Sequence, residues 1–253
     1  MLKELGKYFD HYTINARFMP AFFSVLPFVL TMLAWCPISK NILGASLTVL
    51  ISFGVMTFIS TFISNLGNGC QKKLFVIWGG APTTTILRYR DQVLDKYTKQ
   101  RYLKWLDGKI DGLNLPKVED EIKDPIDADL KYRSAINFLR EFTRDKTKYP
   151  PVYRDNVAYG FARNLLSIRV MGLLVAFICV LINLYFVWLA LSVGQSDLGL
   201  EIPKGYLFGI GAGFSSLFFL FAFSLIVNGS FVKERALRYA KTLLESCEVD
   251  SDP

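Results

Sequence analysis

Four long stretches of this chain contain no Asp, Glu, Lys or Arg, and they constrain the fold more than any other feature. Each is close to the ~20 apolar residues that a helix needs to cross the hydrocarbon of a bilayer. A long polar block separates the second stretch from the third. The sequence therefore predicts a mainly α, four-helix transmembrane protein, with a mostly helical cytoplasmic domain inserted between two helical hairpins. The stretches run from Met19 to Cys36, Ile42 to Leu66, Val170 to Val193 and Gly205 to Val227.

The distribution of basic residues indicates how the chain is oriented. Of its 29 Lys and Arg residues, only Lys40 and Lys204 lie in the connections inside the two hairpins. Basic residues near span ends favour the cytoplasmic side, so we expect the N-terminus, the polar block and the C-terminus there. The predicted divisions are an amphipathic N-terminus (1–17), a first hairpin (18–66), a basic domain (67–168), a second hairpin (169–229) and a C-terminal helix and tail (230–253).

Cysteine and histidine usage argues against a disulfide framework or a zinc centre. The four cysteines are isolated from one another and there is one histidine, so no metal or other cofactor is expected. A run of acidic residues surrounds Pro125, where carboxylates would complement the start of a helix. A divalent-cation site is the alternative interpretation. The run comprises Glu119, Asp120, Glu121, Asp124, Asp127 and Asp129.

Hydroxyl side chains mark one face of the second span. Thr57, Thr61 and Ser64 recur there at helical spacing, and this face is the candidate lining of a pore. Alternatively, these hydroxyls bond to their own helix or to neighbouring helices.

Glycines open the fourth span, where Gly205, Gly209 and Gly213 form a doubled small-xxx-small pattern. This pattern predicts a close packing seam, within one subunit or between subunits. The spans contain no Asp, Glu, Lys, Arg or His, which disfavours an ion-coupled transporter. Four spans are few for a complete conduction path, so a pore is expected to require homo-oligomerisation.

The segment after the second span predicts a short strand at Leu74–Ile77, a glycine turn and a helix start. Thr83 and Thr84 are candidates to cap free amides, where a helix start attracts anions. Arg88 and Arg90 add fixed charges suited to phosphate. These features favour a phosphate or nucleotide site, although the segment is not a Walker A sequence. An ordinary capped helix with surface arginines is the alternative.

A second basic run, 96–105, alternates charges with aromatic rings and predicts a helix. Such a surface can grip phosphates and stack bases. It can also rest on anionic lipid headgroups. The candidate ligand-binding residues in this run are Lys99, Arg101, Tyr102 and Lys104.

Further helices are expected at 126–144, 156–168 and 231–247, the second running into the third span. Residues 72–169 hold 20 basic and 13 acidic side chains, so this block accounts for the net charge of +7 of the whole chain. The excess favours anionic partners, among them nucleotides, nucleic acid and lipid headgroups.

Three segments of the chain carry a resemblance to a family of bacterial inner-membrane proteins. They are Asp10–Arg17 ahead of Pro20-Ala21, Trp78–Asp91 and Tyr159–Asn164. The layout is similar to membrane effectors of bacterial anti-phage systems, including the Hailong effector. The resemblance implies a nucleotidyltransferase partner that makes a nucleotide or single-stranded DNA oligomer. It also implies a tetramer-like homo-oligomer whose cytoplasmic domains bind that oligomer and control a pore.

Two functions follow as hypotheses. The first is a non-enzymatic membrane effector. A ligand binds the basic domain, and residues 156–169 transmit the resulting conformational change to the spans. The second is a non-conducting scaffold whose basic face binds anionic lipid or a protein partner. An enzyme is not expected, because neither a nucleophile-base pair nor a catalytic metal constellation is visible in the sequence.

Overall fold

The computed structural model describes residues 10–36, 42–194 and 206–249. These residues are mostly helical and include no strand, which confirms the predicted mainly α class. The chain divides into two compact units, Met1–Cys70 with Gly160–Asn228, and Gln71–Tyr159 with Gly229–Pro253. We call the first the membrane unit and the second the charged unit.

The helices of the membrane unit are α2 (His11–Thr13), η1 (Ile14–Phe18), α3 (Met19–Trp35), α4 (Ile42–Ile77), α10 (Arg169–Gly194), α11 (Tyr206–Phe221) and η3 (Ala222–Ile226). The elements η1 and η3 are π-helical. The helices of the charged unit are α5 (Pro82–Thr85), α6 (Lys96–Lys109), α7 (Val118–Lys123), α8 (Pro125–Phe142), α9 (Pro150–Ser167) and α12 (Gly229–Val249). The boundary between the units falls within α4 and within α9.

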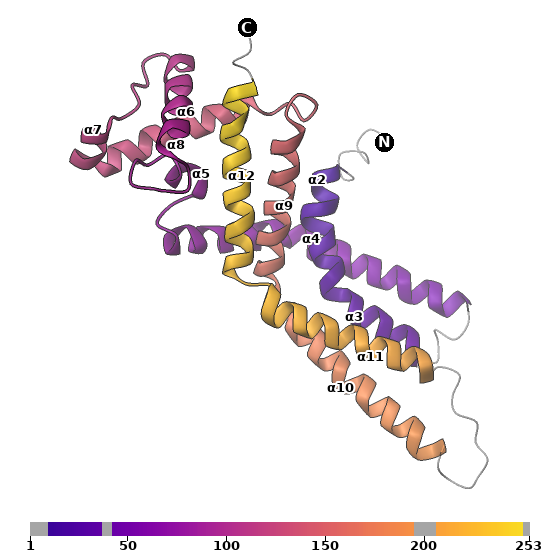
Figure 1. Ribbon diagram of the computed structural model, residues 1–253. Coiled ribbons are helices and arrows are strands. Elements are labelled where there is room, and N and C mark those ends of the chain that lie inside the picture. Colours follow the sequence, from indigo (N-terminus) through magenta and orange to yellow (C-terminus); the bar gives the residue numbers. More distant parts are fainter. Residues whose placement is uncertain (1–9, 37–41, 195–205, 250–253) are drawn as a thin grey trace. The chain divides into compact units, whose positions relative to one another are not determined.

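Within the described residues, four helical stretches are long and apolar enough to cross a membrane, and they correspond to the four predicted spans. They are His11–Trp35, Ile42–Thr85, Arg169–Ser192 and Tyr206–Ile226. Helices α3, α10 and α11 pack against one another along the membrane unit (Figure 1).

The predicted strand at Leu74–Ile77 is wrong, because these residues form the last turns of α4. The helical hydrogen bonding continues through Trp78, whose N–H donates to the Leu74 carbonyl at 2.9 Å. Gly79 then takes a φ of 74°, a left-handed conformation that ends the helix. The apolar, β-branched run therefore prolongs a helix that has already started, and no strand among the described residues is available to pair with it.

Asn183 is the polar centre of the packing between α3 and α10. Its side chain is buried, with the residue 2% exposed. Its Oδ1 accepts from Trp35 Nε1 at 2.8 Å, while its Nδ2 donates to Thr31 Oγ1 at 2.9 Å and to the Cys179 carbonyl at 2.7 Å. An amide at membrane depth is thus satisfied inside the chain, as hydrocarbon requires.

Gly209 confirms the predicted packing seam within one chain. A Cβ atom there would lie 1.9 Å from Trp35 Cζ2, so a larger residue would displace the indole. Gly213 lies close to Asn183, and a Cβ added to this glycine would touch Asn183 Cβ at 3.5 Å. Gly211 faces open space, as its position off the seam indicates, and Gly205 lies outside the described residues.

The core of the charged unit forms where α12 packs against α5, α6 and α8. Fully buried side chains fill it, including Ile86, Leu106, Leu139, Leu243 and Leu244. Figure 1 shows α12 alongside α9, and within this unit the rings of Tyr159 and Tyr239 stack at 6.3 Å. The predicted C-terminal helix is therefore part of the same unit as the central block.

Local signals explain where the helices of the charged unit begin. Asp95 caps α6 by accepting from the amides of Tyr97 and Thr98, and Asp124 caps α8 by accepting from those of Ile126 and Asp127. The helix expected at 126–144 is therefore observed as α8. The helix expected at 156–168 begins earlier, at Pro150, and is interrupted at Ile168 before α10.

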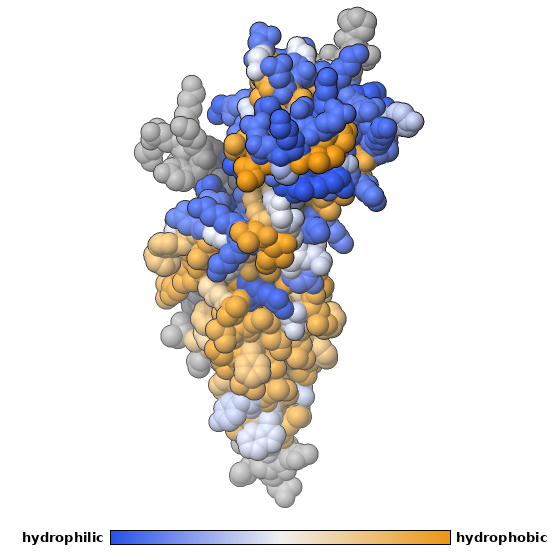
Figure 2. All heavy atoms as spheres, turned by 90° about the vertical axis from the view of Figure 1, so that its left-hand side faces the viewer, coloured by the Kyte–Doolittle hydropathy of each residue, from blue (hydrophilic) through white to orange (hydrophobic). Residues whose placement is uncertain are grey.

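The surfaces of the two units differ in character. Figure 2 shows apolar residues over the membrane unit and mostly hydrophilic residues over the charged unit on the viewed face. The aromatic rings of the fourth span differ in exposure. Phe214 is 69% exposed, whereas Phe223 is buried against other side chains. These rings are thus either surface-facing or core-filling.

We predict opposite effects for alanine at two glycines of α11. Gly209→Ala forces the Trp35 ring to move and should destabilise the protein by about 1–3 kcal/mol. Gly211→Ala meets no neighbouring atom and should be neutral or stabilise the helix by up to about 1 kcal/mol. Thermal unfolding in mild detergent, followed by circular dichroism, measures both. Equal melting temperatures for the two variants would contradict the seam.

Candidate functional site

The glycine turn after α4 is built as a close backbone approach. Gly79 and Gly80 have φ values of 74° and 143°, which other residues rarely adopt. A Cβ on Gly80 would lie 2.8 Å from Thr85 Cγ2 and 3.0 Å from Arg88 Nη2. The two glycines therefore let the chain reverse tightly against the Arg88 side chain.

Arg88 is engaged inside the charged unit. Its Nε and Nη2 donate to the two carboxylate oxygens of Asp129 at 2.8 and 2.6 Å, and Nη2 also donates to the Gly79 carbonyl at 2.9 Å. The Arg88 side chain is 13% exposed. The bidentate geometry expected for a phosphate is thus occupied by a carboxylate of α8.

Lys99 is also a structural cation in this arrangement. It is 3% exposed, and its Nζ donates to the carbonyls of Arg88 and Asp91 at 2.5 and 2.6 Å. Burial lowers the pKa of Lys99, while the carboxylates of Asp91 and Glu121 act in the opposite direction. Lys99 therefore holds the loop that leads from α5 to α6.

Glu121, on α7, binds the same loop. This carboxylate is buried and accepts from the Tyr89 amide at 2.8 Å and from the Tyr132 hydroxyl at 2.8 Å. Burial first, and then the hydrogen bond to Glu121, raise the pKa of Tyr132. The acidic run therefore serves folding through Glu121, Asp124 and Asp129. Among the described residues, no group of three or more His, Cys, Asp or Glu side chains could hold a metal ion.

Thr83 and Thr84 do not form the expected capped helix start. Helix α5 has only four residues, and its N-cap is Ala81, which makes no side-chain cap hydrogen bond. Both threonines are buried, and Thr83 Oγ1 accepts from Arg140 Nη2 at 3.1 Å. Thr83 therefore links α5 to α8, and the Thr84 amide donates to the Ala81 carbonyl at 2.8 Å.

The remaining candidates separate into buried and exposed side chains. Tyr102 is 3% exposed, whereas Arg90 and Lys104 are exposed to solvent. Arg101 is also exposed and donates to Glu248 Oε1 through Nε and Nη2 at 3.1 and 2.9 Å. Of the candidate cations, Arg88 and Lys99 are therefore held inside the charged unit, whereas Arg90, Arg101 and Lys104 are exposed, the last two on the outer face of α6.

That outer face carries a shallow depression with a volume of ≈ 410 Å³, which we call the α6 groove. Lys109 Nζ lies 5.5 Å from the centre of the Trp105 ring. Two lysines and a tryptophan give the groove both phosphate-binding and stacking groups. Its lining residues are Arg101, Lys104, Trp105, Gly108 and Lys109.

An aromatic cluster supports the α6 groove from behind. The Phe142 ring meets Trp105 edge to face, with centroids 5.4 Å apart, and packs against Tyr149 at 6.0 Å. Lys148 Nζ lies 5.3 Å from the Tyr149 ring. The sequence-based set of candidates missed Trp105, Lys109 and Lys148. The spacing of four residues between Trp105 and Lys109 was a usable signal, since such residues share a helix face.

The hydroxyls of the second span bond to their own helix. Thr57 Oγ1 donates to the Phe53 carbonyl at 2.8 Å, and Thr61 Oγ1 donates to the Phe58 carbonyl at 2.6 Å. Ser64 is half-buried. This bonding matches the alternative interpretation of these residues, and pore lining stays a prediction.

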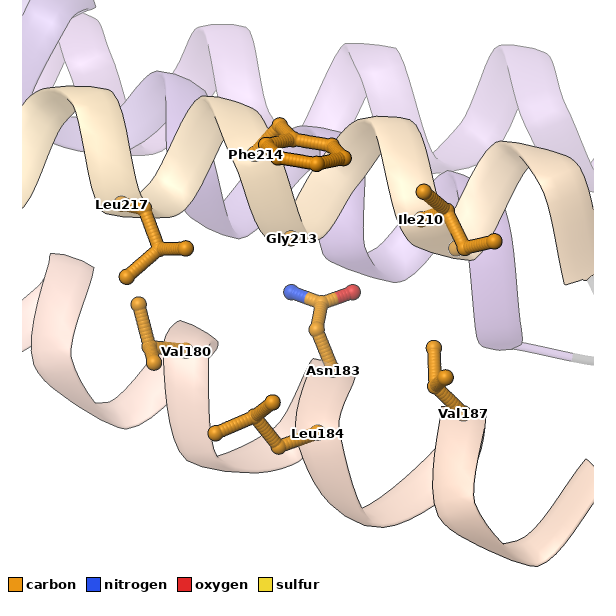
Figure 3. Close-up of a pocket in the computed structure, with 9 residues that line it drawn as sticks. Val180, Asn183, Leu184, Val187, Ile210, Gly213, Phe214 and Leu217 are labelled. Carbon is orange, nitrogen blue, oxygen red and sulfur yellow. The ribbon is translucent and has the colours of Figure 1, made fainter. Parts of the chain in front are cut away.

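The membrane unit contains a small apolar groove between α10 and α11, with a volume of ≈ 160 Å³. Figure 3 shows Asn183 pointing from α10 toward Gly213, and Val180 facing Leu217. The Asn183 amide is already hydrogen-bonded, and the other lining residues are apolar or glycine. The groove can therefore accept hydrocarbon but offers no group for catalysis or ion binding.

Comparisons of the chain with protein-family models, with curated proteins and with solved structures find no match.

We predict that Arg88 and Asp129 stabilise the charged unit as a pair. Arg88→Gln and Asp129→Asn should each lower its free energy of unfolding by about 2 kcal/mol, because each leaves a charged partner without its hydrogen bonds. Arg90→Gln, on the exposed neighbour, should change it by less than about 0.5 kcal/mol. Urea unfolding of the full chain in mild detergent, followed by tryptophan fluorescence, measures these values. Equal effects of Arg88→Gln and Arg90→Gln would contradict the pairing.

Tyr102 generates a prediction for alkaline pH. Burial raises the pKa of this phenol from 10.0 to about 12. The folded state favours the neutral form, so its contribution is complete below pH 10 and is lost as the pH rises through about 12. Tyr102→Phe should make the free energy of unfolding fall less steeply across this window. Tyr97→Phe, a control at a residue that is 73% exposed, should keep the wild-type slope.

Proposed function

We propose that this chain is a ligand-controlled membrane effector of bacterial anti-phage defence. In this proposal it sits in the inner membrane with both termini and the charged unit in the cytoplasm. Its subunits assemble into a channel or membrane-disrupting pore. A nucleotide or single-stranded DNA oligomer, made by a partner nucleotidyltransferase, binds the charged unit and controls that assembly.

The α6 groove is the observation that carries the ligand part of this proposal. It combines exposed Lys104 and Lys109 with the Trp105 ring on one surface of α6. Arg101 at its edge pairs with Glu248, with both side chains about half exposed. An incoming phosphate can compete with Glu248 for this guanidinium, because an exposed ion pair contributes only about 0–1 kcal/mol.

A second candidate function is a non-conducting scaffold, and a separate surface favours it. Large aliphatic side chains stand exposed along α7 and α8, with Ile122 and Ile126 at 75% and 76% and Leu130 at 53%. An apolar stripe on an otherwise hydrophilic unit is typical of a protein-binding surface. The own-helix bonding of Thr57 and Thr61 is also compatible with a bundle that conducts nothing.

We predict that replacing the groove lysines weakens binding of single-stranded DNA. Lys104→Ala with Lys109→Ala removes two phosphate contacts, so the slope of log affinity against log salt should fall by roughly 1.4. Fluorescence anisotropy of a labelled twelve-nucleotide oligomer, titrated at several salt concentrations, measures this change. The charge-matched control is Lys123→Ala with Arg133→Ala, on exposed positions of α7 and α8.

Equal losses in the two double variants would mean that only net charge matters, and the groove would be the wrong site. No binding by the wild type at low salt would overturn the oligonucleotide as ligand. Ion flux from vesicles containing the protein separates the two functions. The effector requires the oligomer to change the flux, whereas the scaffold requires no flux in either condition.

A further inference from the structure

One short segment leads into the third span and contacts the first, second and fourth spans. It comprises residues 160–172, the last turns of α9, Ile168 and the first turn of α10, and we call it the junction. Ile168 is buried and shares a hydrophobic cluster with Ala21 of the first span and Ile63 of the second. Gly160 lies against the first span as well, because a Cβ there would meet Tyr12 Oη at 2.8 Å.

Asn164 connects the junction to the first and second spans. It is 1% exposed, and its Nδ2 donates to the Ala16 carbonyl at 2.6 Å. Its Oδ1 occupies the space beside Gly67 of α4, where a Cβ would lie only 1.9 Å away. The amide therefore fits only where the second span has a glycine.

Arg169 makes the corresponding connection to the fourth span. Its Nε donates to the Phe223 carbonyl at 2.8 Å and its Nη2 to the Ser224 carbonyl at 2.7 Å. Close by, Gly172 leaves room for the Phe223 ring, since a Cβ there would lie 2.6 Å from Cζ of that ring. A guanidinium at the start of the third span thus holds the backbone at the end of the fourth.

The carbonyl groups that accept from Asn164 and Arg169 all lie in π-helical turns. In η1, the Met19 amide donates to the Ile14 carbonyl, and in η3 the Val227 amide donates to the Ala222 carbonyl at 3.1 Å. Each bond spans five residues where an α-helix spans four. Such turns are rare, are less favourable than α-helix, and occur frequently at functional sites. A π-turn that returns to α-helix shifts the register of the residues beyond it.

We propose that the junction is a latch that keeps the first and fourth spans in their π-helical registers through Asn164 and Arg169. Movement of α9, whose first turns belong to the charged unit, would release both turns together. The latch depends on the proposed function in one respect only, which is that ligand binding to the charged unit is the signal that moves α9. The coupling between the two turns is a property of the membrane unit and can be tested without any ligand.

The test is hydrogen–deuterium exchange of the full chain in lipid nanodiscs, with no oligonucleotide added. Asn164→Leu removes the donor to η1 and keeps the branched shape and the number of side-chain heavy atoms, and Arg169→Met removes the donors to η3. Each variant should speed exchange in both peptides, those covering 14–19 and 222–227, by roughly fivefold or more, because each loses at least one hydrogen bond. Ser167→Ala is the matched control, because its hydroxyl donates only to the Asn164 carbonyl of its own helix.

The effect of each substitution on the distant turn decides the outcome. If Asn164→Leu leaves 222–227 unchanged and Arg169→Met leaves 14–19 unchanged, the two contacts are independent caps and the latch is wrong. Arg169→Lys keeps one donor and should give an intermediate rate in both peptides, which provides the same test should a larger change prevent folding. A protein that passes this test but shows no response to oligonucleotides would refute the proposed function and leave the latch intact.

Discussion

Hydrocarbon cannot hydrogen-bond, and this constraint shapes the membrane unit. Every polar group there must find its partner within the protein. Asn183 satisfies the constraint with Trp35, Thr31 and a backbone carbonyl, and the threonines of α4 satisfy it with their own helix. Carbonyls of the two π-turns also accept from side chains outside those turns, those of Asn164 and Arg169.

The charged unit solves a related problem with its cations. Its loop from Gly79 to Asp95 has little regular structure, so its carbonyls and amides need side-chain partners. Arg88 within the loop, Lys99 of α6 and Glu121 of α7 provide them. Arg88 and Lys99, two basic residues of the kind that bind anions, therefore stabilise a loop. The excess positive charge that remains available lies on exposed residues such as Lys104 and Lys109.

The sequence was informative wherever the signal was local. The absence of charges over about twenty residues predicts the spans. Asp95 and Asp124 are N-cap residues directly ahead of α6 and α8, and Asp is a residue type favoured at helix starts. The local signal failed at Leu74–Ile77, because β-branched residues at the end of a long helix have no other strand to join. Propensity over four residues cannot outweigh a helix already formed.

The roles of individual polar residues could not be predicted, because their partners are distant in sequence. Arg88 meets Asp129 41 residues away, and Asn183 meets Trp35 148 residues away. Asp129 belongs to an acidic run that fits the start of α8 equally well, so nothing local indicates that it binds Arg88. Trp105 and Lys109, four residues apart on one helix, were within reach of such reasoning.

The distribution of paired and exposed cations also limits how the proposed ligand could act on this protein. A ligand that displaced Asp129 from Arg88 would have to replace two short charge-assisted bonds and expose a carboxylate, which is unfavourable unless it brings comparable bonds. Arg101 and Glu248 form a weaker, half-exposed pair that joins α6 to α12. A phosphate bound in the α6 groove can exchange for Glu248 at little cost and would thereby loosen the contact between these two helices. Regulation through this ion pair is therefore physically easier than regulation through the buried loop.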